Sequence, residues 1–317
     1  MTDITVIICT FNRSSGLNKT LHSLAASVVP SSISWEVLII DNNSTDATAD
    51  VAKSFVKQQP NRFRYLLETK QGKSFALNRG IAESAGRVLA FVDDDAVVQA
   101  DWLFNLSSPI LEGECQGTGG RILPQGTFRP PAWFPKDHQQ AQGALVIFDL
   151  GPQRSRLHTA PFGTNMAFRK FVFEKYGEFR TDLGPPPAPH RGEDSEFAGR
   201  LLAAGEEMLY LPSALVFHEL PVHRMTKSYI QKWSLEKGYS DAALSSEAER
   251  YKIGGVPLYL VRRLLVWATR WLASVRPAQR FGNKLNALWI VGQIVEHRRK
   301  KSLRVPRLGD ATPAAEQ

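Results

Sequence analysis

The chain has few cysteines, no long uncharged hydrophobic run and no common nucleotide-binding loop. Its two cysteines, Cys9 and Cys115, argue against a disulfide-stapled secreted fold and a cysteine-based zinc site. The first ten residues lack the basic start of a signal peptide, so we expect a reducing, cytoplasmic location. Without Gly-x-x-x-x-Gly-Lys-Ser/Thr, or Gly-x-Gly-x-x-Gly after the first predicted strand, the sequence excludes ordinary ATPases and GTPases and disfavours Rossmann dehydrogenases.

What is present is globular in composition but uneven in charge. Hydrophobic residues make up 43% of the 317 residues, which excludes disorder as the main state. Residues 1–224 carry 22 basic and 24 acidic residues, whereas residues 225–317 carry 17 and 7, a net charge of +10. The second part is therefore predicted to meet an anionic surface. We expect phospholipid rather than nucleic acid, because no recognised nucleic-acid module is present.

Strand and helix patterns alternate in the first half of the chain. Apolar runs predict three strands, at residues 5–9, 36–40 and 87–92. Helical patterns lie between them, at 15–27, 46–58 and 74–84. This alternation predicts an α/β fold with a mostly parallel, doubly wound sheet. Ligands of such sheets bind at the carboxyl ends of the strands, so the loops after Cys9, Ile40 and Val92 are the candidate site.

The third of these loops carries three consecutive acids. In an extended chain Asp93 and Asp95 share one face and Asp94 points away. Two carboxylates at a strand end suit Mg²⁺ or Mn²⁺, and such a cation would hold a diphosphate. The alternative is a solvated acidic turn. His218, which ends a later strand pattern, is a candidate to complete the metal shell with Asp95, and His223 and His190 are competitors for that role.

Two further groups have both a structural and a functional interpretation. Glu193 and Asp194 precede a helical stretch, where carboxylates offset the helix dipole. One of them is alternatively a general base. Lys73 follows Gly72 at the start of a helix, where a cation is either solvated or in contact with phosphate.

Taken together, these motifs resemble the family 2 glycosyltransferases of the GT-A fold. The matching segments come in the family's order and are 6–13, 41–46, 72–74, 78–80, 93–95, 163–169 and 192–194. The resemblance spans residues 5–218, about two-thirds of the chain. It implies an inverting, single-displacement transfer of a sugar from a nucleotide-diphosphate sugar to a hydroxyl group.

The resemblance also implies roles for particular residues. Those expected to bind the nucleotide sugar are Thr10, Phe11, Asn12, Arg13, Asp41, Asn43, Lys73, Asn78, Asp93 and Asp94. Asp95 is expected to bind Mg²⁺ or Mn²⁺, with His218 as the predicted partner. Asp194 is the expected general base, with Glu193 orienting the acceptor. Gly163 and Asn165 are expected on the sugar or acceptor side.

The basic C-terminal part has a helical pattern. No 18-residue uncharged stretch occurs in 258–275, so we predict no membrane span there. At about 100° per residue, its three arginines occupy one sector of the helix, and its apolar residues mostly occupy others. These apolar residues are Leu260, Leu264, Trp267, Trp271 and Val275. With the basic cluster 297–301, this pattern predicts an amphipathic helix at a membrane surface. The alternative is a helical subdomain packed on the catalytic domain.

The sequence therefore predicts a catalytic domain at 1–224, a basic amphipathic region at 225–302 and a disordered tail at 303–317. We expect a metal-dependent enzyme on the inner face of the cell membrane that acts on a saccharide or lipid-linked acceptor. It is expected to add a single sugar, because a Gln-x-x-Arg-Trp motif is missing. Two alternatives stay open. One is a nucleotidyltransferase, although the Gly-rich first loop of those enzymes is absent here. The other is an inactive relative that binds sugar nucleotide or acts as a scaffold.

Overall fold

The computed structural model describes residues 2–245 and 252–304, which fall into two compact units. The first unit comprises Met1–Arg129 and Leu145–Met225, and the second comprises Pro130–Ala144 and Thr226–Gln317. The boundary at 225/226 lies next to the one predicted at 224/225, but the second unit also takes in residues 130–144. The predicted tail lies outside the described residues from position 305 onward.

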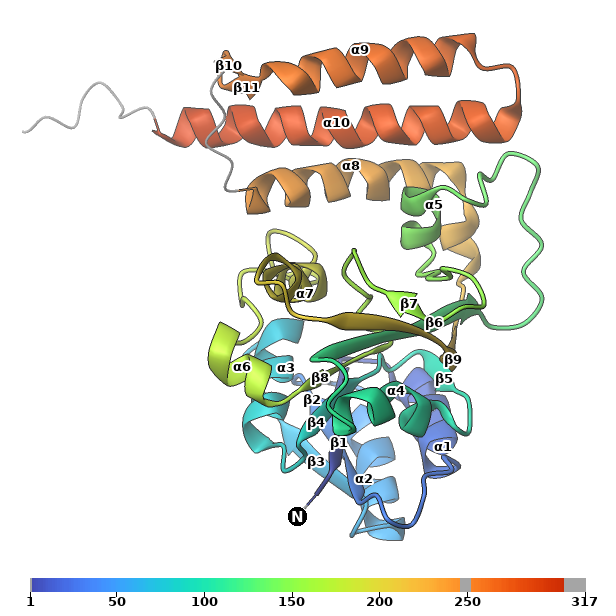
Figure 1. Cartoon of the computed structure of the whole chain (residues 1–317), viewed down its shortest axis with the longest axis vertical. Coiled ribbons are helices and arrows are strands. Elements are labelled where there is room, and N and C mark those ends of the chain that lie inside the picture. The colour runs from blue at the N-terminus through green and yellow to red at the C-terminus, as the bar shows by residue number, and fades with distance from the viewer. Residues whose placement is uncertain (1, 246–251, 305–317) are drawn as a thin grey trace, which may run out of the picture. The chain divides into compact units, whose positions relative to one another are not determined.

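The first unit is built on a sheet, and the sequence predicted three of its first four strands but not the one at Phe63–Leu67. Its parallel strands are β1 (Ile4–Thr10), β2 (Trp35–Asp41), β3 (Phe63–Leu67) and β4 (Val88–Phe91). They lie in the order β3-β2-β1-β4, with Thr10 beside Asp41 in the register (Figure 1). The helices that connect them are α1 (Ser14–Ala25), α2 (Thr48–Gln58) and α3 (Lys73–Glu83).

The sheet continues with five strands, of which the sequence pattern indicated only the end of the last, at 214–217. These strands are β5 (Ala96–Val98), β6 (Gly117–Pro124), β7 (Ser155–Arg156), β8 (Met166–Arg169) and β9 (Met208–His218). β8 lies antiparallel between β4 and β6, whereas β6 and β9 are parallel. The remaining helices of this unit are α4 (Trp102–Leu111), α6 (Phe171–Tyr176), α7 (Glu193–Ala203) and the short 3-10 helix Val222–Met225.

Helices cover both faces of the sheet, because successive strand residues point to opposite sides. Ile4, Val6 and Ile8 of β1 belong to a core with α1, α2 and α4. Ile7, between them in sequence, belongs to a second core with α3, α6 and α7. The expectation of a mostly parallel sheet flanked by helices and followed by a helical segment is confirmed.

The second unit is mainly helical. Its elements are α5 (Gln139–Ala144), α8 (Lys227–Leu244), β10 (Lys252–Ile253), β11 (Val256–Pro257), α9 (Leu258–Ala273) and α10 (Pro277–Arg304). Helices α8 and α9 both pack along α10 (Figure 1). Within the described ranges 2–245 and 252–304, no helix has both the length and the apolar character that crossing a bilayer requires.

Helix α9 uses part of its predicted apolar face for packing inside this unit. Leu260 is fully buried, and Leu264 and Trp267 pack with it against Ile290 and Trp289 of α10. The face that the sequence assigned to the membrane is therefore the inner face of a helical hairpin. The sequence did not show this, because the pattern of one helix does not identify what covers it.

Two glycines allow α8 and α10 to approach each other closely. A Cβ atom added at Gly238 would lie 2.1 Å from the carbonyl oxygen of Trp289, and one added at Gly292 would lie 2.2 Å from that of Leu235. Both distances are far below van der Waals contact, and the neighbouring atoms belong to backbone. Any larger side chain must push the two helices apart.

Gly292→Ala is therefore expected to lower the free energy of unfolding of the second unit by about 1–3 kcal/mol, the usual cost of overpacking. Urea unfolding followed by tryptophan fluorescence measures this, because five of the seven tryptophans lie in the second unit. Gly199→Ala in α7 is the control, since its added Cβ meets nothing within 4 Å. Equal stability of Gly292→Ala and the wild type would contradict the close approach.

Candidate active site

The candidate site lies where the carboxyl ends of β1, β2 and β4 meet. The three predicted loops lie together there because these strands are parallel neighbours. The first two loops are tied to each other: the backbone amide of Asn12 donates to Ser44 Oγ (2.9 Å), and the amide of Thr45 donates to Asn12 Oδ1 (2.7 Å). Asn12 and Asn43 have positive φ angles of 50° and 64°, a region that asparagine tolerates better than most residues.

Asp41 is the buried acid of these two joined loops. Its carboxylate accepts hydrogen bonds from the hydroxyl of Tyr65 and the backbone amide of Ser44, both at 2.9 Å. Burial and this hydrogen bond raise the pKa of Tyr65 to about 12. Thr10 is buried beside Asp41, whereas Phe11 is 46% exposed. The predicted nucleotide residues of β1 and β2 therefore differ widely in accessibility.

The acidic triplet follows a turn and not an extended path, which corrects one prediction. Arg13 Nε lies 3.5 Å from Asp94 Oδ1, and the same guanidinium pairs with Asp95. Asp94 therefore does not point away from Asp95, since the chain turns at these two residues. Burial raises the pKa of Asp94 to about 7, although the charge of Arg13 opposes this.

Asp95 and His218 lie together, as the sequence predicted. His218 ends β9 opposite Ala96 of β5, and its Nε2 is 3.2 Å from Asp95 Oδ1. Burial by itself raises the pKa of Asp95, but the hydrogen bond and charge of His218 and the charge of Arg13 together hold it well below its usual range. His218 is buried, and its Nδ1 has no hydrogen-bond partner among the described residues.

This pair fits a divalent cation in donor chemistry. A carboxylate oxygen and an imidazole nitrogen are both ligands of Mn²⁺, and carboxylate alone also suits Mg²⁺. The positively charged guanidinium of Arg13 already lies against Asp95 and Asp94, so the place attracts a cation. No group of three acidic, histidine or cysteine side chains in ranges 2–245 and 252–304 is arranged to hold a metal. The chain thus offers two donors, and the others must come from ligand or water.

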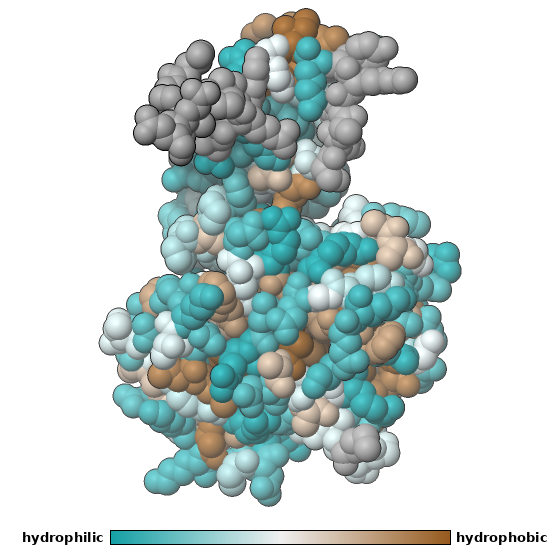
Figure 2. All heavy atoms as spheres, turned by 90° about the vertical axis from the view of Figure 1, so that its left-hand side faces the viewer, coloured by the Kyte–Doolittle hydropathy of each residue, from teal (hydrophilic) through white to brown (hydrophobic). Residues whose placement is uncertain are grey.

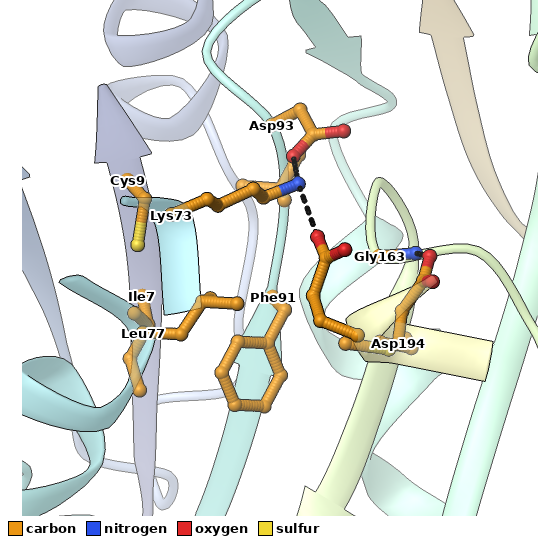
Figure 3. A pocket seen from close by; sticks show the side chains of 11 residues that line it. Ile7, Cys9, Lys73, Leu77, Phe91, Asp93, Gly163 and Asp194 are labelled. Atoms are coloured by element: carbon orange, nitrogen blue, oxygen red, sulfur yellow. Dashed lines mark hydrogen bonds and ion pairs between the residues drawn. The ribbon is translucent and has the colours of Figure 1, made fainter. Parts of the chain in front are cut away.

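Asp93 has different partners from Asp95 and belongs to a network around Lys73 (Figure 3). Lys73 Nζ lies 2.7 Å from Asp93 Oδ1 and 3.6 Å from Glu193 Oε1. Thr164 Oγ1 donates to Asp93 Oδ2 at 2.5 Å. Burial lowers the pKa of Lys73, but the two carboxylates outweigh it and hold that pKa well above its ordinary value. Burial raises the pKa of Glu193, against the charge of Lys73.

Asp194 is held in place by backbone amides. Gly163 N and Ser195 N each donate to one of its carboxylate oxygens at 2.7 Å (Figure 3). The N-cap residue of α7 is Gly192, so neither Glu193 nor Asp194 is the cap of this helix. Asp194 also lines a narrow pocket of about 10 Å³, the room that one water molecule needs. The other residues lining this pocket include Cys9, Lys73, Asp93, Gly163 and Glu193.

The side chain of Asn165 is enclosed within the fold, and its predicted place on the sugar or acceptor side stays a prediction. Asn165 is fully buried, and its amide nitrogen donates to the carbonyls of Arg121 (3.0 Å) and Ala214 (2.8 Å). Its Oδ1 accepts from the indole of Trp102 at 2.8 Å. Asn165 joins β6, β9 and α4, and so anchors the Gly163–Thr164 segment that contacts the two acids.

Asn78 is also engaged with the protein itself. Its amide donates to the carbonyl of Phe179 (2.8 Å) and accepts from the amide of the same residue (3.1 Å). A contact between Asn78 and a nucleotide stays a prediction. Two residues that contact predicted site acids were missed, Thr164 and Tyr65. Thr164 lies between two predicted residues in sequence, whereas Tyr65 lies in a strand that was not predicted.

The parallel half-sheet with its acidic turn, continued by antiparallel strands, is the architecture of GT-A glycosyltransferases. The chain belongs to glycosyl transferase family 2: the family model matches residues 5–177, more than half of its length. The family resemblance drawn from the motifs is thereby confirmed, and the chain is a glycosyltransferase of this family.

The relatives include proteins named for polysaccharide synthesis and for sugar transfer to a dolichyl phosphate sugar. The chain is 27% identical to glycosyltransferase AglE of Haloferax volcanii, over 74% of this chain and 75% of AglE. It is 25% identical to the succinoglycan biosynthesis protein ExoM of Rhizobium meliloti, over 77% and 75% of the two chains. It is 23% identical to the glucosyl-dolichyl phosphate glucuronosyltransferase of H. volcanii, over 82% and 85%.

A solved structure shares the fold. The chain is similar to the mannosyltransferase PcManGT of Pyrobaculum calidifontis, whose structure contains GDP-Man and Mn²⁺. The TM-score is 0.64, with 18% sequence identity, over 94% of this chain and 87% of that one. This likeness extends the agreement in fold beyond the residues that the family model matches.

Proposed function

We propose that this chain is an inverting glycosyltransferase that adds one sugar from a nucleotide-diphosphate sugar to a hydroxyl of a saccharide or lipid-linked saccharide. The observation that carries the proposal is the position of Asp194. Its carboxylate, fixed by two backbone amides, lines the same pocket as Lys73 and Asp93 at the ligand-binding edge of the sheet. A single base at that place suffices for one displacement.

In this proposal Asp95 and His218 hold Mg²⁺ or Mn²⁺ together with the donor diphosphate. When bound, the cation neutralises the negative charge that develops on the leaving diphosphate. Arg13, which pairs with Asp94 and Asp95, lies where it can share that charge. The two joined loops that carry Asn12 and Asp41 hold the nucleoside.

Asp194 takes the proton in the displacement. The acceptor oxygen forms a bond to the anomeric carbon while the bond from that carbon to the diphosphate oxygen breaks, and the acceptor's proton passes to Asp194. The amides of Gly163 and Ser195 keep the carboxylate aimed and prevent its rotation. Glu193, tied to Lys73, lies beside Asp194 and orients the acceptor.

We also propose a place for the enzyme in the cell, peripheral on the inner face of the membrane. The relative named as a glucosyl-dolichyl phosphate glucuronosyltransferase supports a lipid-linked acceptor. The net charge of +10 over residues 225–317 supports an anionic membrane surface as partner.

A set of nucleotide sugars (UDP-glucose, UDP-N-acetylglucosamine and GDP-mannose) tests donor and metal together. With Mn²⁺ or Mg²⁺, one donor at a hundredfold excess over its Kd is expected to stabilise the protein by about 2.7 kcal/mol. That is about 5–10 °C in Tm for a unit of this size. The anomeric configuration of the product, measured by NMR, then tests inversion. Equal stabilisation with excess chelator would contradict the metal, and retained configuration would contradict single displacement.

A further inference from the structure

The outer face of α9 carries hydrophobic side chains that nothing in the described part of the second unit, up to residue 304, covers. Leu265 and Leu272 are 63% and 69% exposed, and Val261 is 41% exposed. At about 100° per residue these three residues fall within a sector of about 40°, so they form one stripe along the helix. Figure 2 shows hydrophobic side chains gathered over the α9 region beside hydrophilic ones. We call Val261, Leu265 and Leu272 the α9 stripe.

The stripe is distinct from the face that packs on α10. Leu260 and Trp267, which belong to the packed face, are separated from Leu265 by more than about 100° around the helix. The stability of the hairpin therefore does not depend on the stripe. Single exposed hydrophobic residues are normal on protein surfaces, but an aligned set on a long helix indicates a binding surface.

Positive charge borders this stripe and no negative charge lies on the helix. Leu258–Ala273 contains no aspartate or glutamate, and Arg262 lies about 60° from the stripe. Farther round, Arg270 stacks on Trp267 at 4.9 Å and Arg263 on Trp289 at 5.3 Å. These two guanidinium groups thus line the border between the packed face and solvent.

The charges decide which partner suits the stripe. A second copy of this chain would bring two helices with only positive charges face to face, which is repulsive. An anionic bilayer complements both features, because leucine and valine side chains enter the interface while arginines meet lipid phosphates. The basic end of α10, with Arg298 and Arg299, lies at the same end of the hairpin as the start of α9 (Figure 1).

We propose that the α9 stripe is the surface by which the chain docks on an anionic lipid bilayer, with α9 lying in the plane of the membrane. This inference rests on the membrane partner in the proposed function, and it assigns that partner to one face of one helix. It reverses the face expected from the sequence, since the tryptophan side of α9 is used inside the unit.

Vesicle flotation of the full chain tests the proposal. The probes are vesicles of equal parts phosphatidylglycerol and phosphatidylcholine, and vesicles of phosphatidylcholine alone. We expect binding to the anionic vesicles that weakens as salt rises, because salt screens surface attraction. Leu265→Ser/Leu272→Ser is expected to lower the partition coefficient about tenfold or more, because two hydrophobic side chains no longer enter the interface. Val28→Ser/Phe171→Ser, which alters exposed hydrophobic residues of the first unit, is expected to bind like the wild type.

Each other outcome overturns the proposal. If the wild type ignores anionic vesicles at low salt, or if the stripe variant binds as well as the wild type, the stripe is not the docking surface. If light scattering shows a wild-type dimer that the stripe variant dissociates, the occupant is a second copy. Circular dichroism and the Tm check that the stripe variant is folded. If it is not, Val261→Ser is the milder variant for the same measurement. Metal-dependent stabilisation by the same nucleotide sugars is measured without vesicles. A protein that keeps this stabilisation but does not bind vesicles contradicts the docking surface and not the proposed function.

Discussion

Asp194→Asn is expected to slow sugar transfer by about 10²–10⁴-fold, the usual effect of losing a general base, while leaving donor binding intact. Asparagine preserves the shape of the side chain, and its single oxygen still accepts the hydrogen bond that Gly163 N donates, although its amide nitrogen cannot accept the one from Ser195 N. It cannot take a proton from the acceptor hydroxyl. Steady-state transfer rates and donor-dependent Tm shifts, measured on the same preparation, provide the two readouts.

Glu193→Gln is the matched comparison for this variant. Glu193 lies next in sequence and contacts Lys73 at 3.6 Å, so its loss is expected to weaken acceptor use more than the chemical step. A near-normal rate for Asp194→Asn with a dead Glu193→Gln would move the base to Glu193. Normal rates for both variants would show that the acids only support the start of α7.

Asp95→Asn is expected to remove metal-dependent donor binding and to lower transfer by at least about 10³-fold, since a bound cation supplies several kcal/mol of charge stabilisation. A neutral amide is a poor ligand for Mg²⁺ or Mn²⁺. His218→Ala is expected to have a smaller effect, because Asp95 and the diphosphate oxygens remain. Mn²⁺ binding measured by electron paramagnetic resonance, with and without nucleotide sugar, checks both variants.

Asp182→Asn controls for the change of charge. Asp182 is paired with Arg180 at 2.6 Å, and this variant is expected to bind Mn²⁺ as the wild type does. Full activity of the wild type in excess chelator would refute the metal role of Asp95. Loss of activity in Asp95→Asn with normal Mn²⁺ binding would instead assign Asp95 to the fold or to the donor.

Strands β1, β2 and β4 of the parallel half were predictable because they are buried on both faces, whereas β3, which is only partly buried, was not predicted. Runs such as Thr5–Cys9 carry only side chains that suit such burial, and the helices between them keep neighbouring strands parallel. The antiparallel half was not predictable in the same way. β6 begins with a Gly-Thr-Gly-Gly stretch, and it pairs with β9 far along the chain, where no local pattern specifies the partner.

The sequence predicted which loops form the site, but it did not predict the directions in which their side chains point. The ends of parallel strands placed Asp41 and Asp93 at one edge, whereas Asp194 was assigned to the site by the family resemblance. The direction of each side chain depends on local backbone geometry that the motif does not contain. The turn at Asp94 brought it to Arg13, and the buried start of β8 turned Asn165 into the protein.

The inserted segment 130–144 has a consequence for synthesis on the ribosome. It is translated before the first unit is complete, but its partners α8 and α10 follow only after Met225. At the usual 5–20 residues per second, α10 emerges on the order of 10 s later. During that interval Ala141 of α5, which is buried in the finished protein, lacks the helices α8 and α10 that later pack on α5. The second unit is thus the last to fold, and a nascent chain halted before α10 presents this segment to chaperones and proteases.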